Sequence, residues 1–230
     1  MRLVFKLLYH QFAFAYDLVA ATVSVGRWKD WVSSILPFIR GTRILEIGSG
    51  PGHLQRLLLS RGLDSVAIDE SYPMLRLARR NILRENYQSG ATHQSGYPQI
   101  KSNRGLAQHL PFADSSFDSI IATFPAEYIK DPRTLSEVRR CLSDGGRLIV
   151  LPVAMQTGRG MLEMLMSLLF RITRQNPVDP IEEVKKKLST PFVESGFEVE
   201  VKELEVGSSL LLVILAQVAS AAVLGGENAA

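Results

Sequence analysis

Four residues at alternate positions, Glu46, Gly48, Gly50 and Gly52, form the pattern in this chain with the clearest chemical meaning. They start within the apolar run 44–47 and precede a leucine-rich segment with helical spacing, which predicts a strand, a tight turn and a helix N-terminus. Glycine adopts positive φ and lets a ligand approach the backbone closely. A carboxylate two residues before the first glycine is poorly placed beside a pyrophosphate, so the pattern favours a cationic ligand.

The glycine spacing differs from the dinucleotide fingerprint G-x-G-x-x-G, because His53 stands where that fingerprint has its third glycine. The spacing instead resembles the first motif, E/D-x-G-x-G-x-G, of the class I S-adenosylmethionine (SAM) methyltransferases. A strand-to-helix turn with chance glycines is the alternative interpretation. A second carboxylate, Asp69, ends the apolar run 66–68 and stands 17 residues after Gly52, the offset expected of a residue that accepts hydrogen bonds from ribose hydroxyls. For Asp69 alone, a helix-capping role is the alternative.

Two further runs resemble motifs of the same family. Residues 104–118 are similar to the run G-D-A-x-x-L-P-F-x-D-x-S-F-D of one large branch, and residues 142–148 are similar to its turn L-x-P-G-G-x-L. The resemblance covers residues 43–151 in detail. It has two departures: Leu106 replaces an acidic residue that commonly faces the adenine amino group, and residues 123–132 lack the histidines of a Leu-His-His-type segment.

The resemblance implies SAM as the cofactor and S-adenosylhomocysteine as its product, with direct displacement of the methyl group by a small-molecule acceptor. It implies that Glu46 and the glycine turn hold the methionine part and that Asp69 holds the ribose. Met74, Leu106 and Ala107 would then line the adenine, and Thr123 and Phe124 would face the sulfonium. The residues expected to bind the cofactor are Glu46, Gly48, Ser49, Gly50, Gly52, Asp69, Glu70, Met74, Leu106, Ala107, Thr123 and Phe124.

Such a displacement needs a general base only if the acceptor nucleophile carries a proton. His10, Tyr16, Glu127 and Tyr128 are the candidates by expected location, and a structural role is the alternative for each. No Cys/His cluster has metal-ligand spacing, so no metal site is expected. The single cysteine excludes an internal disulfide and agrees with a cytoplasmic location.

Apolar runs alternate with segments of helical spacing through the chain, which predicts an α/β fold. The resemblance implies the Rossmann-like, doubly wound form, a mostly parallel seven-stranded sheet with helices on both faces and an antiparallel last strand. A ligand then lies at the carboxyl ends of the strands, where the strand order reverses. Strands are expected at 43–47, 65–68, near 99–100, and at 117–122, 147–151, 198–206 and 209–218; helices are expected at about 53–61, 73–85, 132–142 and 181–195.

The 230 residues are enough for one domain with an added subdomain. The net charge of +3 is mild, and the arginines at 76–84 are expected to form a solvated face, so nucleic acid is not an expected partner. Basic residues near the N-terminus and in the segment 154–180 suit a peripheral contact with an anionic membrane surface. The sequence does not specify an oligomeric state. The expected parts are a helical cap at 1–40, a SAM-binding core at 41–153, a hydrophobic lid at 154–180, a C-terminal helix with two strands at 181–224, and a disordered tail at 225–230.

The first hypothesis is SAM-dependent methyl transfer to a hydrophobic, lipid- or quinone-like acceptor, because the Met-rich segment 154–180 can cover an apolar molecule. The N-terminal segment is also loosely similar to enzymes that methylate quinone precursors. Packing of the Met-rich segment on the N-terminal helix alone is the alternative. A non-catalytic SAM-binding or scaffold protein is the second hypothesis, suggested by Leu106 and by the altered segment 123–132. An NAD-dependent oxidoreductase is the third, and the glycine spacing disfavours it.

Overall fold

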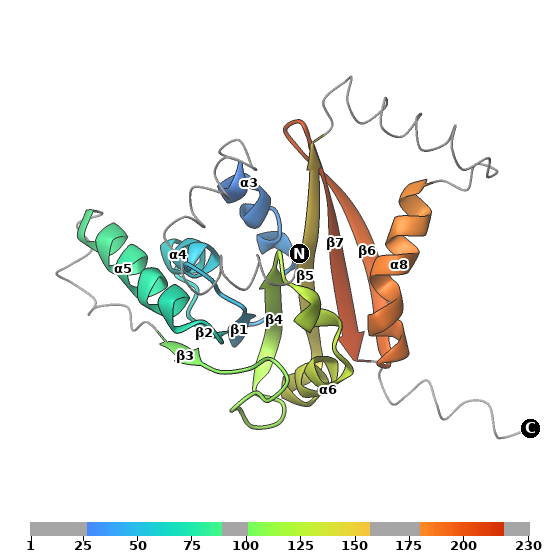
Figure 1. Cartoon of the computed structure of the whole chain (residues 1–230), viewed down its shortest axis with the longest axis horizontal. Helices are drawn as coiled ribbons and strands as arrows, with labels where there is room; N and C mark the ends of the chain where they lie inside the picture. The colour runs from blue at the N-terminus through green and yellow to red at the C-terminus, as the bar shows by residue number, and fades with distance from the viewer. Residues whose placement is uncertain (1–26, 89–100, 157–179, 219–230) are drawn as a thin grey trace, which may run out of the picture.

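A computed structural model describes residues 27–88, 101–156 and 180–218 (Figure 1). Seven strands form one sheet in the order β3-β2-β1-β4-β5-β7-β6, and every neighbouring pair is parallel except the two that involve β7. The α/β class and the antiparallel last strand are therefore confirmed. The strands are β1 (Ile44–Ile47), β2 (Ser65–Asp69), β3 (Lys101–Arg104), β4 (Phe117–Thr123), β5 (Leu142–Gln156), β6 (Phe197–Val206) and β7 (Ser209–Val218).

Helices cover both faces of this sheet, and two apolar clusters fill the space beneath them. One cluster joins α3 and α4 to the sheet through residues such as Trp31, Leu58 and Ile149. The other joins α6 and α8 to the opposite face through residues such as Leu135 and Phe192. The helices are α3 (Trp28–Ser33), α4 (His53–Ser60), α5 (Tyr72–Gln88), α6 (Pro132–Cys141) and α8 (Pro180–Glu194), with 3-10 turns η1 (Leu36–Phe38) and η2 (Glu127–Lys130).

Two strand boundaries differ from the expectation. β3 begins at Lys101, just beyond the run expected near 99–100, and its side chains are mostly exposed, so hydrophobicity gives little signal there. β5 has 15 residues against 4 in β1, extending from Leu142 to Gln156. A break in its pairing with β4 falls between Leu142 and Arg147, where Gly145 adopts a φ of 72°. The expected turn before the fifth strand is thus present as an interruption within β5.

Several expectations concern segments outside the described residues. These are most of the helical cap, the lid beyond Gln156, and the tail at 225–230. Within the described part of the cap, α3 packs against α4, and its buried residues Trp31 and Val32 share an apolar cluster with Leu54, Leu57 and Leu58 of α4. None of the described helices is both long and apolar enough to span a bilayer.

Candidate functional site

The strand order reverses between β1 and β4, because the chain proceeds from β1 to β2 and β3 on one side and then crosses to β4 on the other. Open α/β sheets bind ligands at the carboxyl ends of such strands. β1 ends there in the turn from Gly48 to Gly52. Two hydrogen bonds shape this turn: the Gly48 N–H donates to the Ile68 carbonyl at 2.7 Å, and the Gly52 N–H donates to the Ser49 carbonyl at 3.0 Å.

The glycines of this turn have different surroundings, although all three have positive φ of 70°, 51° and 82° in chain order. A Cβ at Gly48 would overlap the hydroxyl of Tyr128, and one at Gly52 would lie 2.9 Å from the Cβ of Ala78. A Cβ at Gly50 would meet no heavy atom within 4 Å. Gly48 and Gly52 are therefore required by packing, whereas Gly50 borders open space that a ligand can enter.

Asp69 ties the turn to the end of β2. Its Oδ2 accepts the Gly50 N–H at 2.8 Å, and its Oδ1 accepts the Ser71 N–H at 2.8 Å. The side chain is nearly buried, with 8% of the residue exposed. The next residue, Glu70, is exposed, and its carbonyl accepts a 3.0 Å bond from the Arg104 Nε. Asp69 therefore holds the turn through the Gly50 N–H, whereas the side chain of Glu70 is exposed.

Glu46 lies beneath the turn and is fully enclosed, with 1% of the residue exposed. Its Oε2 accepts a 2.9 Å bond from the Gln55 Nε2 on α4, and Gln55 in turn accepts a 3.2 Å bond from the Ser65 hydroxyl on β2. Burial raises the pKa of Glu46 to about 8; the Gln55 bond opposes this shift, and the charge of Asp69 adds to it. The Glu46 carboxyl is therefore protonated at neutral pH in the ligand-free chain, and a nearby cation would favour its ionised form.

One more polar group faces this corner. Ser49 is 5% exposed, and its hydroxyl has no hydrogen-bond partner among the described residues. Sequence reasoning included Ser49 by its place in the turn but missed Gln55, because nothing in a leucine-rich helix marks one glutamine as the partner of a strand carboxyl.

The expected adenine residues flank the same corner. Met74 on α5 is fully buried and Ala107 is nearly so, whereas Leu106 is 51% exposed. The Gly105 N–H donates to the Asp69 carbonyl at 3.2 Å, which brings this segment beside the end of β2. Leu106 therefore offers an apolar side chain at the surface where an acidic residue would offer a hydrogen-bond acceptor.

Aromatic rings gather at the carboxyl end of β4. Thr123 ends the strand, and Phe124 follows with a φ of 48°, unusual for any residue other than glycine. Its ring lies 4.3 Å from the Trp28 ring and 6.0 Å from the Trp31 ring, centroid to centroid. The ring of His53 lies 6.1 Å from Trp28. Trp28 was not among the predicted site residues, because a tryptophan on an apolar helical stripe looks like core.

Comparison with known proteins shows which families this chain is similar to. Residues 45–150, which include the glycine turn and Asp69, match the family model described as a methyltransferase domain. Among curated relatives, the demethylmenaquinone methyltransferase of Renibacterium salmoninarum is 31% identical over 139 residues, 59% of this chain and 52% of the relative. That of Symbiobacterium thermophilum is 30% identical over 151 residues, 63% of this chain and 57% of the relative. The chain thus spans only a little over half the length of these relatives.

Solved structures agree on the fold. A putative S-adenosyl-L-methionine-dependent methyltransferase of Methanococcus maripaludis has a TM-score of 0.56 at 20% identity, covering 90% of this chain and 93% of that one. Haemonchus contortus phosphoethanolamine N-methyltransferase 2, solved in complex with S-adenosyl-L-methionine, has a TM-score of 0.52 at 17% identity, covering 85% of this chain and 53% of that one. At these identities the likeness establishes the fold alone, which is Rossmann-like.

The four candidate bases differ in their position relative to the glycine turn. The Tyr128 hydroxyl donates to the Ile47 carbonyl at 3.1 Å, so this side chain lies directly against the glycine turn. The Glu127 side chain is 85% exposed and lies 3.8 Å from Lys130, so it is turned towards solvent. His10 and Tyr16 lie outside the described residues. Of the candidates that the structure describes, only Tyr128 reaches the turn.

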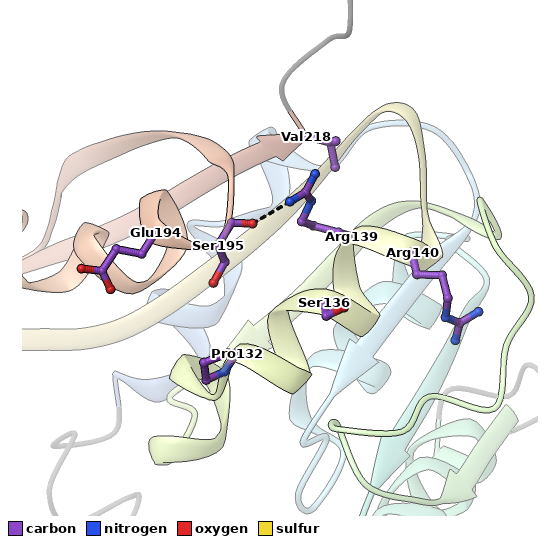
Figure 2. Close-up of a pocket in the computed structure, with 7 residues that line it drawn as sticks. All are labelled: Pro132, Ser136, Arg139, Arg140, Glu194, Ser195 and Val218. Carbon is purple, nitrogen blue, oxygen red and sulfur yellow. Dashed lines mark hydrogen bonds between the residues drawn. The ribbon is translucent and has the colours of Figure 1, made fainter.

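A separate cavity of about 560 Å³ opens on the other helix layer (Figure 2). Arg139 on α6 lies across it and donates to the Ser195 carbonyl at 2.8 Å, just beyond the end of α8. None of the residues predicted from the sequence to bind the cofactor or to act as a base lines this cavity. Its lining residues are Pro132, Ser136, Arg139, Arg140, Glu194, Ser195 and Val218. Within the described residues, no cluster of His, Cys, Asp or Glu side chains has the arrangement of a metal site.

Proposed function

We propose that this chain binds SAM at the turn between β1 and α4 and transfers its methyl group to a small hydrophobic acceptor. The observation that carries the proposal is the open space at Gly50, where a Cβ would meet nothing within 4 Å, next to a carboxylate, Asp69, that accepts the Gly50 N–H. A ligand with a ribose and a positive charge fits this combination, because a carboxylate accepts hydrogen bonds from hydroxyl groups and the buried Glu46 ionises in response to a cation.

The residues at the corner fit the group by their chemistry. Glu46 and the turn would hold the aminoacyl part, and the buried Ser49 hydroxyl, which has no other partner among the described residues, offers it a hydrogen bond. Asp69 would hold the ribose, and Met74 and Ala107 would enclose the adenine. When bound, SAM supplies a sulfonium methyl group for direct transfer to a nucleophile. The chain then needs only to orient the acceptor and exclude water, which can provide much of the rate enhancement.

The acceptor side of the proposal rests on the aromatic group at the end of β4. Trp28 and Phe124 are half-buried, and their rings lie 4.3 Å apart. The left-handed backbone of Phe124 costs of order 1–3 kcal/mol, and such strain persists mainly where the surrounding structure holds a residue for a functional reason. An apolar, ring-containing acceptor suits this wall, in agreement with relatives named as demethylmenaquinone methyltransferases. The Met-rich lid and the peripheral membrane contact would serve the same acceptor.

A non-catalytic SAM-binding protein is the second candidate. It is favoured by Leu106, which is half exposed and offers the adenine amino group no side-chain acceptor. One missing hydrogen bond weakens binding by about 1 kcal/mol and does not abolish it. Turnover therefore separates the candidates, whereas cofactor binding alone does not.

Two measurements test the proposal. Isothermal titration with SAM should give binding that Asp69→Ala weakens by about 10- to 100-fold, from loss of charged hydrogen bonds worth about 1.5–3 kcal/mol. Asp64→Ala is the matched control, because Asp64 is an exposed carboxylate that pairs with Lys101. Unfolding of each variant in urea shows whether it is folded. Equal affinity in a folded Asp69→Ala protein would remove the ribose role.

The second measurement uses SAM with a labelled methyl group and a panel of demethylated quinones with short side chains, lipids and polar amines. Transfer to an apolar acceptor is the expected result. SAM binding with no labelled product over the whole panel would favour the non-catalytic alternative. Mass spectrometry of small molecules retained by the purified protein adds an unbiased view of both ligands.

A further inference from the structure

Three polar side chains from distant segments meet toward the end of the sheet that lies opposite the glycine turn. Arg40 follows η1, Arg147 lies on β5, and Gln217 lies beside Arg147 on β7. With its amide turned to satisfy its neighbours, the Gln217 oxygen accepts from Arg147 Nε at 3.2 Å, Arg147 Nη2 at 2.5 Å and Arg40 Nη1 at 3.0 Å. Two guanidinium groups therefore share one neutral oxygen.

Neither arginine has a carboxylate within ion-pair distance among the described residues. The nearby Asp118 accepts bonds from Arg43 and from the Ser143 hydroxyl. Glu200 pairs with Lys202 at 2.6 Å. Burial and the charge of Arg40 lower the pKa of Arg147, and Glu200 opposes this shift without reaching Arg147. Two like charges held this close, with no carboxylate in ion-pair contact, favour the approach of an anion.

The backbone fixes this pair in place. The Arg40 N–H donates to the Ser119 hydroxyl at 2.8 Å, and the same hydroxyl donates to the Arg40 carbonyl at 2.8 Å. Arg147 lies on β5, between two strands of the sheet. Arg40 Nη1 also lies 3.4 Å from the Gly145 carbonyl. The remaining nitrogens, Arg40 Nε and Nη2 and Arg147 Nη1, have no acceptor among the described residues.

We propose that Arg40, Arg147 and Gln217 form a binding site for a phosphate-type oxyanion. Guanidinium groups bind phosphate oxygens through planar, paired hydrogen bonds, and a dianion would neutralise both charges at once. Arg40 is exposed and Arg147 is half-buried, so the site is open to solvent on one side. The site is separate from the cofactor turn, because Arg147 pairs with Ser119 near the start of β4 and the turn lies beyond the carboxyl end of β1.

Inorganic phosphate is the first probe, with chloride adjusted to keep the ionic strength constant. The midpoint temperature of thermal unfolding of the wild-type chain should rise by about 2–4 °C at 20 mM phosphate if the dissociation constant is a few millimolar. Arg147→Gln and Arg40→Gln should each weaken the apparent affinity at least tenfold. Arg79→Gln is the matched control. It removes the same charge from an exposed position on α5, and Arg79 has no hydrogen-bond or ion-pair partner among the described residues.

The second arm separates a free anion from a lipid headgroup. Sedimentation with phosphatidylcholine vesicles that contain 30% phosphatidylglycerol, compared with phosphatidylcholine alone, measures binding to a phosphodiester at a surface. If only phosphate raises the midpoint temperature, the ligand is a free anion. If the wild type and Arg79→Gln sediment with the phosphatidylglycerol vesicles and Arg147→Gln does not, the ligand is a lipid headgroup. No response in either arm, or equal responses in Arg147→Gln and Arg79→Gln, would overturn the proposal. SAM titration of the same variants should be unchanged, which keeps this test independent of the proposed function.

Discussion

The buried Glu46 carboxyl makes the stability of this chain depend on pH in an unusual direction. Its pKa is about 8 in the folded chain, against an ordinary value of 4.5, because burial disfavours the charged form. At pH values between 4.5 and about 8, the folded chain holds a proton on Glu46 that the unfolded chain releases. The free energy of unfolding therefore falls as pH rises through this window. Below pH 4.5, Glu46 is protonated in both states and no longer reduces the free energy of unfolding.

The size of the effect follows from the two pKa values. One unit of pKa difference corresponds to about 1.4 kcal/mol, so the full penalty above pH 8 is about 4–5 kcal/mol. Between pH 5.5 and pH 7.5 the same linkage gives a loss of about 2–3 kcal/mol. Glu46→Gln keeps the shape and the oxygen that accepts from Gln55 but cannot ionise. Its unfolding free energy should therefore exceed that of the wild type by an amount that grows by about 2–3 kcal/mol over this range.

Denaturant unfolding of both proteins at pH 5.5, 6.5 and 7.5 measures this growth, because groups other than Glu46 cancel in the difference. Glu127→Gln is the control, since the Glu127 carboxylate is 85% exposed and its removal should give a difference that does not change with pH. A wild-type minus Glu46→Gln difference that is constant across the three pH values would refute the reasoning. It would mean that Glu46 is ionised in the folded chain, with a partner or water that the geometry does not include.

Three substitutions test the turn itself. Gly52→Ala should destabilise the chain by about 2–4 kcal/mol in denaturant unfolding, because the new Cβ overlaps Ala78 in addition to the strain of positive φ. Gly62 also has positive φ but borders open space, so Gly62→Ala should cost only about 1 kcal/mol. Gly50→Ala should cost a similar 1 kcal/mol yet weaken SAM binding at least tenfold in titration, and unchanged affinity would show that no ligand approaches there. Tyr128→Phe removes a 3.1 Å hydrogen bond and should cost about 1 kcal/mol of stability, and an unchanged pH profile of turnover would assign Tyr128 a structural role.

The sequence predicted those features that depend on local pattern. The turn and Asp69 follow from backbone and side-chain rules that operate within about 25 residues. Most strands were placed within a residue or two because buried strands read as continuous apolar runs. The predicted position of β3 was wrong by a few residues, because its residues are mostly exposed and form no such apolar run.

Features that depend on distant contacts were not predictable in the same way. The Trp28–Phe124 contact joins residues almost a hundred positions apart, and the left-handed backbone of Phe124 has no marker in a phenylalanine. The Glu46–Gln55 bond is short in sequence but depends on how α4 packs on β1. The motif gave the position of the carboxyl, whereas its protonation state required the burial that only the fold supplies.

The bonds that Asp69 makes within the chain bear on whether the corner must rearrange to bind a nucleoside. A carboxylate has about four lone-pair sites, and two of them accept the N–H groups of Gly50 and Ser71. The two bonds use different carboxylate oxygens, Oδ2 for Gly50 and Oδ1 for Ser71, so Asp69 links the glycine turn to the segment that precedes α5. The turn is therefore already shaped in the ligand-free chain. Because the ordering of the turn has already occurred during folding, its entropy cost does not reduce the affinity for the cofactor.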